Sequence, residues 1–410
     1  MKRLIALIGS VAVLLFIGAS LSCDDDDDPG SSPGQAQDDD DNDDNDNDDN
    51  DNDDNDNDDN DNDDNDDDND DVSPAEAWAV GVDGVYGGSG AGLFLHYRDG
   101  AWTLDESAPA TVNLAAISCF AADRCLAVSD TQVLGYDDAQ WTIDDTFPTA
   151  ADLTLWDVLC LDDDAWVVGR DDDASRPLAW RRQAGVWFAI DTATLPDGSL
   201  LKIKKIADRI LALGYTYDLV YYTTTTYLLA YDSDSGEWQE EHVFNQADRS
   251  DFDFAGADWG LAVGSAANAP LYWGMTTIYE QGTWTNVPPD DYPVSYDTSG
   301  SAFTGVTAVA PGEAWVIGYY GSKVFLEGAY IYHLQDGAWT DAAKPWLTGI
   351  VLNSIDRRDD TGWAVGYVID ENYYPRKGAA AIYQNGDWHW LDLPDGPSNH
   401  WELVDVAIIP

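Results

Sequence analysis

Basic residues are scarce in this chain of 410 residues, which has 19 Lys and Arg against 78 Asp and Glu and a formal net charge of −59. A surface this acidic repels phosphate groups, so we expect no nucleic-acid partner and no attraction to anionic membrane surfaces. Long apolar runs are also missing after residue 23, which argues against a later transmembrane span. With 44% hydrophobic and 12% aromatic residues, the chain can still bury a large core.

Residues that usually carry catalysis or bind metals are few and scattered. The five His and four Cys show no zinc spacing, and no phosphate loop or Ser-His-Asp spacing is present. His96 and His333 each stand six residues before a Trp, so they occupy one repeat position, which favours a structural role. We therefore predict that the chain is not an enzyme and that it holds no cofactor.

The first 23 residues, MKRLIALIGSVAVLLFIGASLSC, have a basic start, an apolar stretch and small residues before a cysteine. This is the layout of a secretory signal. The ending ASLSC resembles the lipobox of bacterial lipoproteins, which implies a signal peptide at 1–22 and a lipid on Cys23. The resemblance places the protein in the cell envelope, at a bacterial outer membrane or cell surface, and an ordinary cleavable signal is the alternative.

Residues 23–72 form an Asp- and Asn-rich tether. From Asp24 to Asp71 the sequence has 28 Asp and no Lys, Arg or Glu, which leaves a charge near −33 on the rest of the mature chain. Such a segment repels itself, cannot bury apolar area and is expected to stay disordered. Its run from Asp38 to Asp71 lacks the Gly and Glu of an EF-hand loop, so only weak, diffuse calcium binding is expected there.

Residues 73–410 contain an internal repeat. One phrase occurs seven times, followed each time by a turn and a tryptophan. The phrases are AWAVG at Ala77, CLAVS at Cys125, AWVVG at Ala165, ILALG at Ile210, GLAVG at Gly260, AWVIG at Ala314 and GWAVG at Gly362. The turn tryptophans are Trp102, Trp141, Trp187, Trp238, Trp284, Trp339 and Trp388.

Alternating runs before both elements complete units of four short strands with a period of roughly 40 to 55 residues, which is typical of β-propeller blades. The sequence therefore predicts an all-β, seven-bladed propeller of four-stranded antiparallel blades. The first unit lacks its first strand, whereas the last strand, within Leu403 to Ile409, has no unit of its own. We expect this strand to close the ring, and the tryptophans to pack between blades.

The blade pattern resembles bacterial propellers built from sialidase-type (BNR-like) and kelch-like repeats, many of which belong to secreted lipoproteins. The turns differ from those repeats, because RDGAW at Arg98 is shorter than an Asp box and the double glycine of kelch blades is absent. The resemblance implies a binding or scaffold module, with a sialidase-like carbohydrate-active enzyme as the alternative. Such an enzyme needs a converging arginine cluster, but Arg98, Arg124, Arg357 and Arg358 flank turns expected away from the long loops.

Three cysteines lie inside the repeat. Cys119 and Cys125 bracket a short turn in one unit, and export permits a disulfide between them. Cys160 takes the place of Cys119 in the next unit and is expected to be a buried free thiol. A bridge from Cys119 to Cys160 is the alternative.

Tyrosine is concentrated in the connections between the second and third strands of the units. In a propeller these connections share one face with the links between blades, so we predict a ligand-binding face for a protein or glycan. The alternative is that the rings only cover apolar strand ends. We otherwise expect a monomer that meets the membrane only through its lipid. The predicted binding residues are Tyr215, Tyr217, Tyr221, Tyr222, Tyr272, Trp273, Tyr319, Tyr320, Tyr373 and Tyr374.

Overall fold

The computed structural model describes the repeat region with several gaps. The described residues are 76–84, 90–109, 113–148, 152–218, 223–245, 247–268, 271–288, 291–292, 301–321, 326–342, 344, 347–370 and 375–410. The expected signal peptide, Cys23 and the acidic tether lie outside them. No helix in this described part has the length and apolar character needed to span a bilayer.

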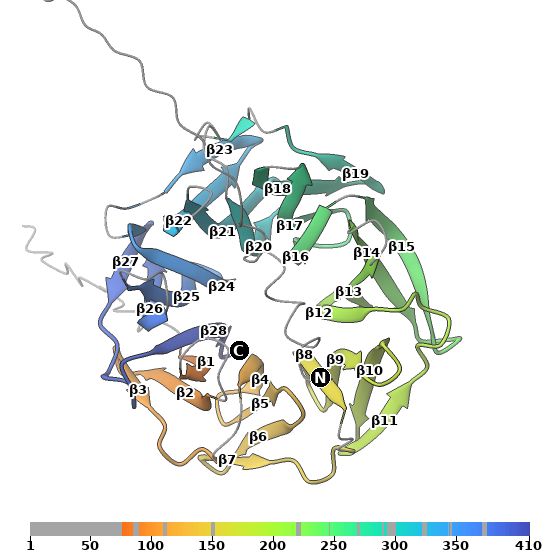
Figure 1. Cartoon of the computed structure of the whole chain (residues 1–410), viewed down its shortest axis with the longest axis horizontal. Helices are drawn as coiled ribbons and strands as arrows, with labels where there is room; N and C mark the ends of the chain where they lie inside the picture. The colour runs from red at the N-terminus through yellow and green to blue at the C-terminus, as the bar shows by residue number, and fades with distance from the viewer. Residues whose placement is uncertain are drawn as a thin grey trace, which may run out of the picture. The chain divides into compact units, whose positions relative to one another are not determined.

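The described strands form seven four-stranded antiparallel sheets arranged as a ring, which confirms the predicted seven-bladed propeller (Figure 1). From the centre outward, blade 1 consists of β28 (Trp401–Ile408), β1 (Ala77–Asp83), β2 (Ala91–Arg98) and β3 (Ala101–Leu104). Blade 2 consists of β4 (Leu114–Ala121), β5 (Arg124–Ser129), β6 (Val133–Asp137) and β7 (Gln140–Ile143). Blade 3 consists of β8 (Leu153–Leu161), β9 (Asp164–Asp171), β10 (Arg176–Gln183) and β11 (Val186–Ile190).

The remaining blades repeat this order. Blade 4 consists of β12 (Ser199–Ile206), β13 (Arg209–Asp218), β14 (Thr223–Asp232) and β15 (Glu237–Asn245). Blade 5 consists of β16 (Ala247–Phe254), β17 (Trp259–Asn268), β18 (Leu271–Glu280) and β19 (Thr283–Asn286). Blade 6 consists of β20 (Ala302–Ala310), β21 (Glu313–Gly321), β22 (Leu326–Gln335) and β23 (Ala338–Asp341). Blade 7 consists of β24 (Ile350–Arg358), β25 (Thr361–Ile369), β26 (Pro375–Gln384) and β27 (Asp387–Leu391).

The C-terminal strand closes the ring, as the half-repeats predict. β28 pairs antiparallel with β1, with Ala77 opposite Ile408 and Asp83 opposite Trp401. Its side chains also fill two blade interfaces, since Leu403 is buried in the core toward blade 7 and Ala407 in the core toward blade 2. The last strand therefore supplies both the inner edge of blade 1 and part of its two packing faces.

The repeated tryptophans pack between neighbouring blades. At four interfaces the tryptophan of the repeated phrase meets the turn tryptophan of the next blade edge to face; Trp78 and Trp141 have ring centroids 5.4 Å apart. The other three pairs are Trp166 with Trp238, Trp315 with Trp388 and Trp363 with Trp102. Where the phrase has Leu126, Leu211 or Leu261 instead, the same place in the core is taken by the leucine.

The glycine that ends most copies of the phrase is explained by a bulge in the innermost strand. Each of the seven innermost strands has a register shift at an equivalent point, for example between Leu352 and Ser354 of β24. In five blades this brings a backbone carbonyl of that strand against the glycine. A Cβ on Gly366 would lie 1.9 Å from the carbonyl oxygen of Val351, and one on Gly264 would lie 1.9 Å from that of Asp248. No side chain fits there without moving the backbone.

The two ends of the ring differ in how the strands are connected. The first-to-second and third-to-fourth strand connections meet at one end, which we call the short-turn end. Most third-to-fourth turns there have two residues with positive φ, as at Asp99 (52°) and Gly100 (82°), which is the hairpin geometry that Asp-Gly favours. The second-to-third connections and the links between blades meet at the opposite end, which we call the long-loop end.

We expect Gly366→Ala to destabilise the propeller by about 3 kcal/mol or more, because the added methyl group meets backbone that cannot move away independently. The matched control is Gly135→Ala in β6, where an added Cβ has ordinary contact with Leu126 at 3.8 Å. That variant should stay within about 1 kcal/mol of the parent protein. Urea unfolding followed by tryptophan fluorescence measures both, and equal effects at the two positions would contradict the bulge explanation.

Removing Trp401 to Pro410 should leave an aggregating or unfolded chain, because β1 would lose its inner partner and two interfaces would lose apolar cover. Size-exclusion chromatography and thermal unfolding test this expectation. A soluble truncated chain that melts cooperatively near the temperature of the full chain would show that the ring does not need its last strand.

Candidate functional site: channel wall and long-loop end

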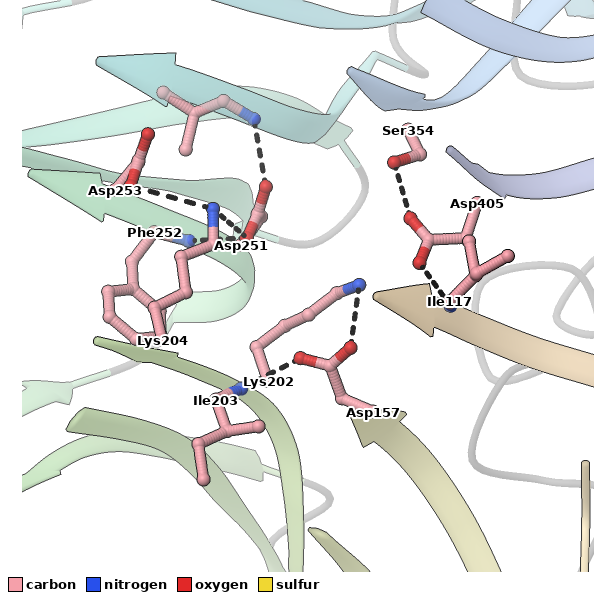
Figure 2. Close-up of polar contacts among 11 residues, drawn as sticks. Ile117, Asp157, Lys202, Ile203, Lys204, Asp251, Phe252, Asp253, Ser354 and Asp405 are labelled. Atoms are coloured by element: carbon pink, nitrogen blue, oxygen red, sulfur yellow. Dashed lines mark hydrogen bonds and ion pairs between the residues drawn. The ribbon is translucent and has the colours of Figure 1, made fainter. Parts of the chain in front are cut away.

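Charged side chains are concentrated on the innermost strands, which surround the centre of the ring and which together we call the channel wall. Among the described residues, the alternate positions after each bulge include five aspartates and two lysines. They are Asp157 on β8, Lys202 and Lys204 on β12, Asp251 and Asp253 on β16, Asp356 on β24 and Asp405 on β28. Most of these groups are drawn in Figure 2.

The aspartates accept hydrogen bonds from backbone amides on the neighbouring innermost strand. Asp405 Oδ2 accepts from Ile117 N at 2.9 Å, and Asp157 Oδ2 accepts from Ile203 N at 2.8 Å (Figure 2). Further along the strands, Asp356 Oδ2 accepts from Ile408 N at 2.8 Å. An innermost strand has an edge of unpaired backbone groups, and a carboxylate from the preceding blade satisfies some of them.

Two further blade interfaces have the same kind of contact, with aspartates at one and a serine at the other. Asp251 and Asp253 of blade 5 accept from Val306 N and Ala308 N of blade 6 at 3.0 and 2.8 Å. Between blades 2 and 3, Ser118 Oγ accepts from Cys160 N at 3.0 Å. Polar side chains therefore join the blades at the channel, while the aromatic cores join them farther out.

The two lysines compensate part of the negative charge. Lys204 Nζ lies 3.4 Å from Asp251 Oδ1 and 3.8 Å from Asp253 Oδ1, so it links blades 4 and 5. Lys202 Nζ lies 3.9 Å from Asp157 Oδ1 of blade 3 (Figure 2). Two positive charges against five carboxylates leave the wall acidic.

Burial changes the protonation of these groups. Loss of water raises the pKa of Asp157 and of Asp356 to about 6, and it also raises the pKa of Asp253. Burial alone would lower the pKa of Lys204, but the nearby Asp251 and Asp253 raise it overall. Asp157 and Asp356 are therefore fully ionised only well above about pH 6.

Two described tyrosines lie on the edge of blade 4 at the long-loop end. Tyr217 is 41% exposed and Tyr215 is half-buried; they stand two residues apart on β13 and so share one face of the blade. Tyr319 and Tyr320 on β21 are both half-buried, and Tyr320 packs on Tyr330 with ring centroids 4.8 Å apart. Tyr320 thus has at least a partly structural role.

The other predicted binding residues are not described in full. Tyr221, Tyr222, Tyr373 and Tyr374 lie outside the described residues. Tyr272 and Trp273 lie on β18, where their backbones pair with Ala267 and Ala266, but their side chains are outside the described part. A common tyrosine-rich binding face therefore stays a prediction.

The predicted structural roles of the histidines and cysteines can be followed directly. His96 stacks on Trp78 and His333 on Trp315, with centroids 4.1 and 4.0 Å apart, and each histidine faces a glutamate. Cys119 and Cys125 form a disulfide across the blade 2 turn, whereas Cys160 is a buried free thiol whose pKa is raised to about 12 by burial.

Three of the four named arginines lie in ion pairs near the short-turn end. Arg98 contacts Glu76, Arg124 contacts Asp163 and Arg357 contacts Glu313. Among the described residues, no group of three or more His, Cys, Asp or Glu is arranged to hold a metal ion. Each of these three arginines pairs with a nearby acidic residue, and they do not converge on one site.

Comparison with known proteins identifies a fold and no family. No protein-family model matches the sequence, and no curated protein matches it. Among solved structures, a protein from Lactobacillus plantarum is 12% identical with a TM-score of 0.55, over 82% of this chain and 100% of that one. This likeness supports the propeller fold alone.

Two further structures match less well. The β-propeller domain of the Trilobed protease from Pyrococcus furiosus is 9% identical with a TM-score of 0.49, over 77% of this chain and 91% of that one. The extracellular domain of a putative one-component system from B. thetaiotaomicron is 10% identical with a TM-score of 0.46, over 80% of this chain and 48% of that one.

Asp356→Asn should remove part of the pH dependence of stability. Because the folded pKa of Asp356 is raised, the folded state holds its proton more tightly than the unfolded state between about pH 4 and 6, so ionisation lowers stability as pH rises through this window. The asparagine oxygen can still accept from Ile408 N but cannot ionise. From pH 4 to pH 7, the free energy of unfolding of the variant should therefore rise by about 2 kcal/mol relative to that of the parent protein.

Urea unfolding at several pH values measures this difference, with Asp395→Asn as a control for removing a negative charge on an exposed segment. If the parent protein and Asp356→Asn show parallel stability curves from pH 4 to 7, Asp356 does not titrate as burial requires.

Proposed function

We propose that this chain is a binding or scaffold module that holds a protein or glycan ligand at its long-loop end. The observation that carries the proposal is the chemical difference between the two ends of the ring. The short-turn end consists of tight turns and local ion pairs. The long-loop end has the longer connections and the exposed ring of Tyr217.

The chemistry of the channel wall also favours binding over catalysis. Its aspartates each accept at least one hydrogen bond that joins two blades, so they already have structural partners. A glycosidase needs a pair of carboxyl groups that can reach a sugar. Binding requires only a rigid surface with amphipathic side chains, and tyrosine supplies large contact area at low conformational cost.

The N-terminal segment supports a proposal about where in the cell the propeller is held. A lipid on Cys23 and a self-repelling tether would hold the propeller at a bacterial outer membrane or cell surface as a monomer. This part rests on the resemblance of ASLSC to a lipobox and on the composition of residues 24–71. Mass spectrometry of the N-terminal peptide distinguishes acylated Cys23 from an ordinary cleaved signal.

The binding face can be tested with the full-length chain on a glycan array and an array of cell-surface proteins. Replacing Tyr215 and Tyr217 together by Ala should weaken binding to the ligand found there by tenfold or more, since truncating a central aromatic contact costs about 1.4 kcal/mol or more.

The matched control is Phe188→Ala on the outer strand β11, because Phe188 is 52% exposed but lies away from the long-loop end. This control should bind like the parent protein. Unchanged affinity of the double tyrosine variant, or an equal loss in Phe188→Ala, would place the binding surface elsewhere.

A further inference from the structure

Arg249 interrupts the repeat at a position that is otherwise apolar. It lies on β16 directly before the bulge and points toward blade 4. The equivalent residues of the other six blades are all buried Leu or Phe: Leu114, Leu155, Leu200, Phe303, Leu352 and Leu403. Arg249 is equally buried, with 2% of its surface exposed. A guanidinium group therefore lies where the other six blades bury an apolar side chain.

The guanidinium has few partners in its surroundings. Its Nη2 donates to Thr277 Oγ1, and its Cζ lies 5.1 Å from the centroid of the Phe244 ring. Its Nε and Nη1 have no hydrogen-bond partner in the structure, and no ion pair joins Arg249 to an acidic residue of the described part. The side chain is held in place, but its donors are not satisfied.

An unsatisfied buried charge is costly. Burial lowers the pKa of Arg249 to about 10, so the group is still a cation at neutral pH. Its charge is compensated in part by the nearby Asp248, by a hydroxyl and by an aromatic face. No carboxylate of the described residues forms a direct ion pair with it, whereas buried charges are normally paired. A leucine, as in the neighbouring blades, would fill the position without this cost. The arginine therefore needs an anion to make the position favourable.

The position lies close to the long-loop end. On blade 4, Tyr215, Thr226 and Phe244 are directly opposite one another across three strands and so share the face turned toward blade 5. Arg249 contacts this row, since its backbone N donates to Thr226 Oγ1 at 3.1 Å. On its own blade, Thr277 Oγ1 donates to Asn286 Oδ1 at 2.8 Å, and Asn286 is exposed. Two hydrogen bonds, from Arg249 to Thr277 and from Thr277 to Asn286, therefore connect the buried guanidinium to an exposed side chain.

We propose that Arg249 is the anchor of a carboxylate-binding site at the interface of blades 4 and 5. A ligand carboxylate would accept hydrogen bonds from Nε or Nη1 and neutralise the buried charge. A singly charged carboxylate fits better than a phosphate, because the neighbouring Asp248 and the strongly acidic chain repel a second negative charge. The Arg249 site does not require the tyrosines to bind a macromolecule.

The test measures thermal unfolding of the full-length chain in sodium formate and in sodium chloride at equal ionic strength. Formate, the smallest carboxylate, should raise the Tm of the parent protein by about 3 °C or more at saturation. Arg249→Leu should have a higher Tm than the parent protein in chloride and no response to formate. Arg209→Leu is the matched control, because Arg209 is exposed and paired with Glu241. It should respond to formate like the parent protein.

Each alternative result overturns the proposal. An equal formate response in Arg249→Leu would show that formate acts elsewhere, and no response in the parent protein would show that the guanidinium does not take a carboxylate. A lower Tm of Arg249→Leu in chloride would show that the arginine is satisfied by a partner within the chain, so that its role is structural.

Discussion

Every blade of this propeller depends on having a neighbour on both faces. A four-stranded blade buries apolar side chains on its two sides, so no blade can be stable at the end of an open row. The pairing of β28 with β1 meets this condition, because it turns the row into a ring and completes blade 1 at the same time. The apolar cores between blades and the hydrogen bonds between innermost strands can form all the way around the ring only after this closure.

The sequence was sufficient to predict the seven blades, the antiparallel order and the strand that closes the ring. These features follow from a repeat that can be recognised in the amino-acid sequence itself. The tryptophan phrase predicts packing between blades, and Trp78, Trp166, Trp315 and Trp363 are indeed buried. Trp284 and Trp339, which meet leucines across their interfaces, are only half-buried. Trp187 also meets a leucine, Leu126, and is buried.

The polar channel and Arg249 were not predicted, and the physical reason is the bulge. One extra residue in each innermost strand reverses which side chains face the preceding and the following blade, so simple alternation places them on the wrong side. Asp157 and Lys204 then look like surface charges within an apolar run. The signal that could have revealed them is that charges recur inside otherwise buried first strands. For the long-loop tyrosines the sequence showed which residues to consider, but composition alone does not say which of their rings are exposed.

The antiparallel pairing of the first and last strands also determines where the chain enters the ring. Ala77 lies opposite Ile408, and the carbonyl of Glu76 accepts from Ile409 N at 2.9 Å, so both ends of the repeat region are at the short-turn end. Whatever precedes residue 76 is attached there, on the opposite side from the long connections.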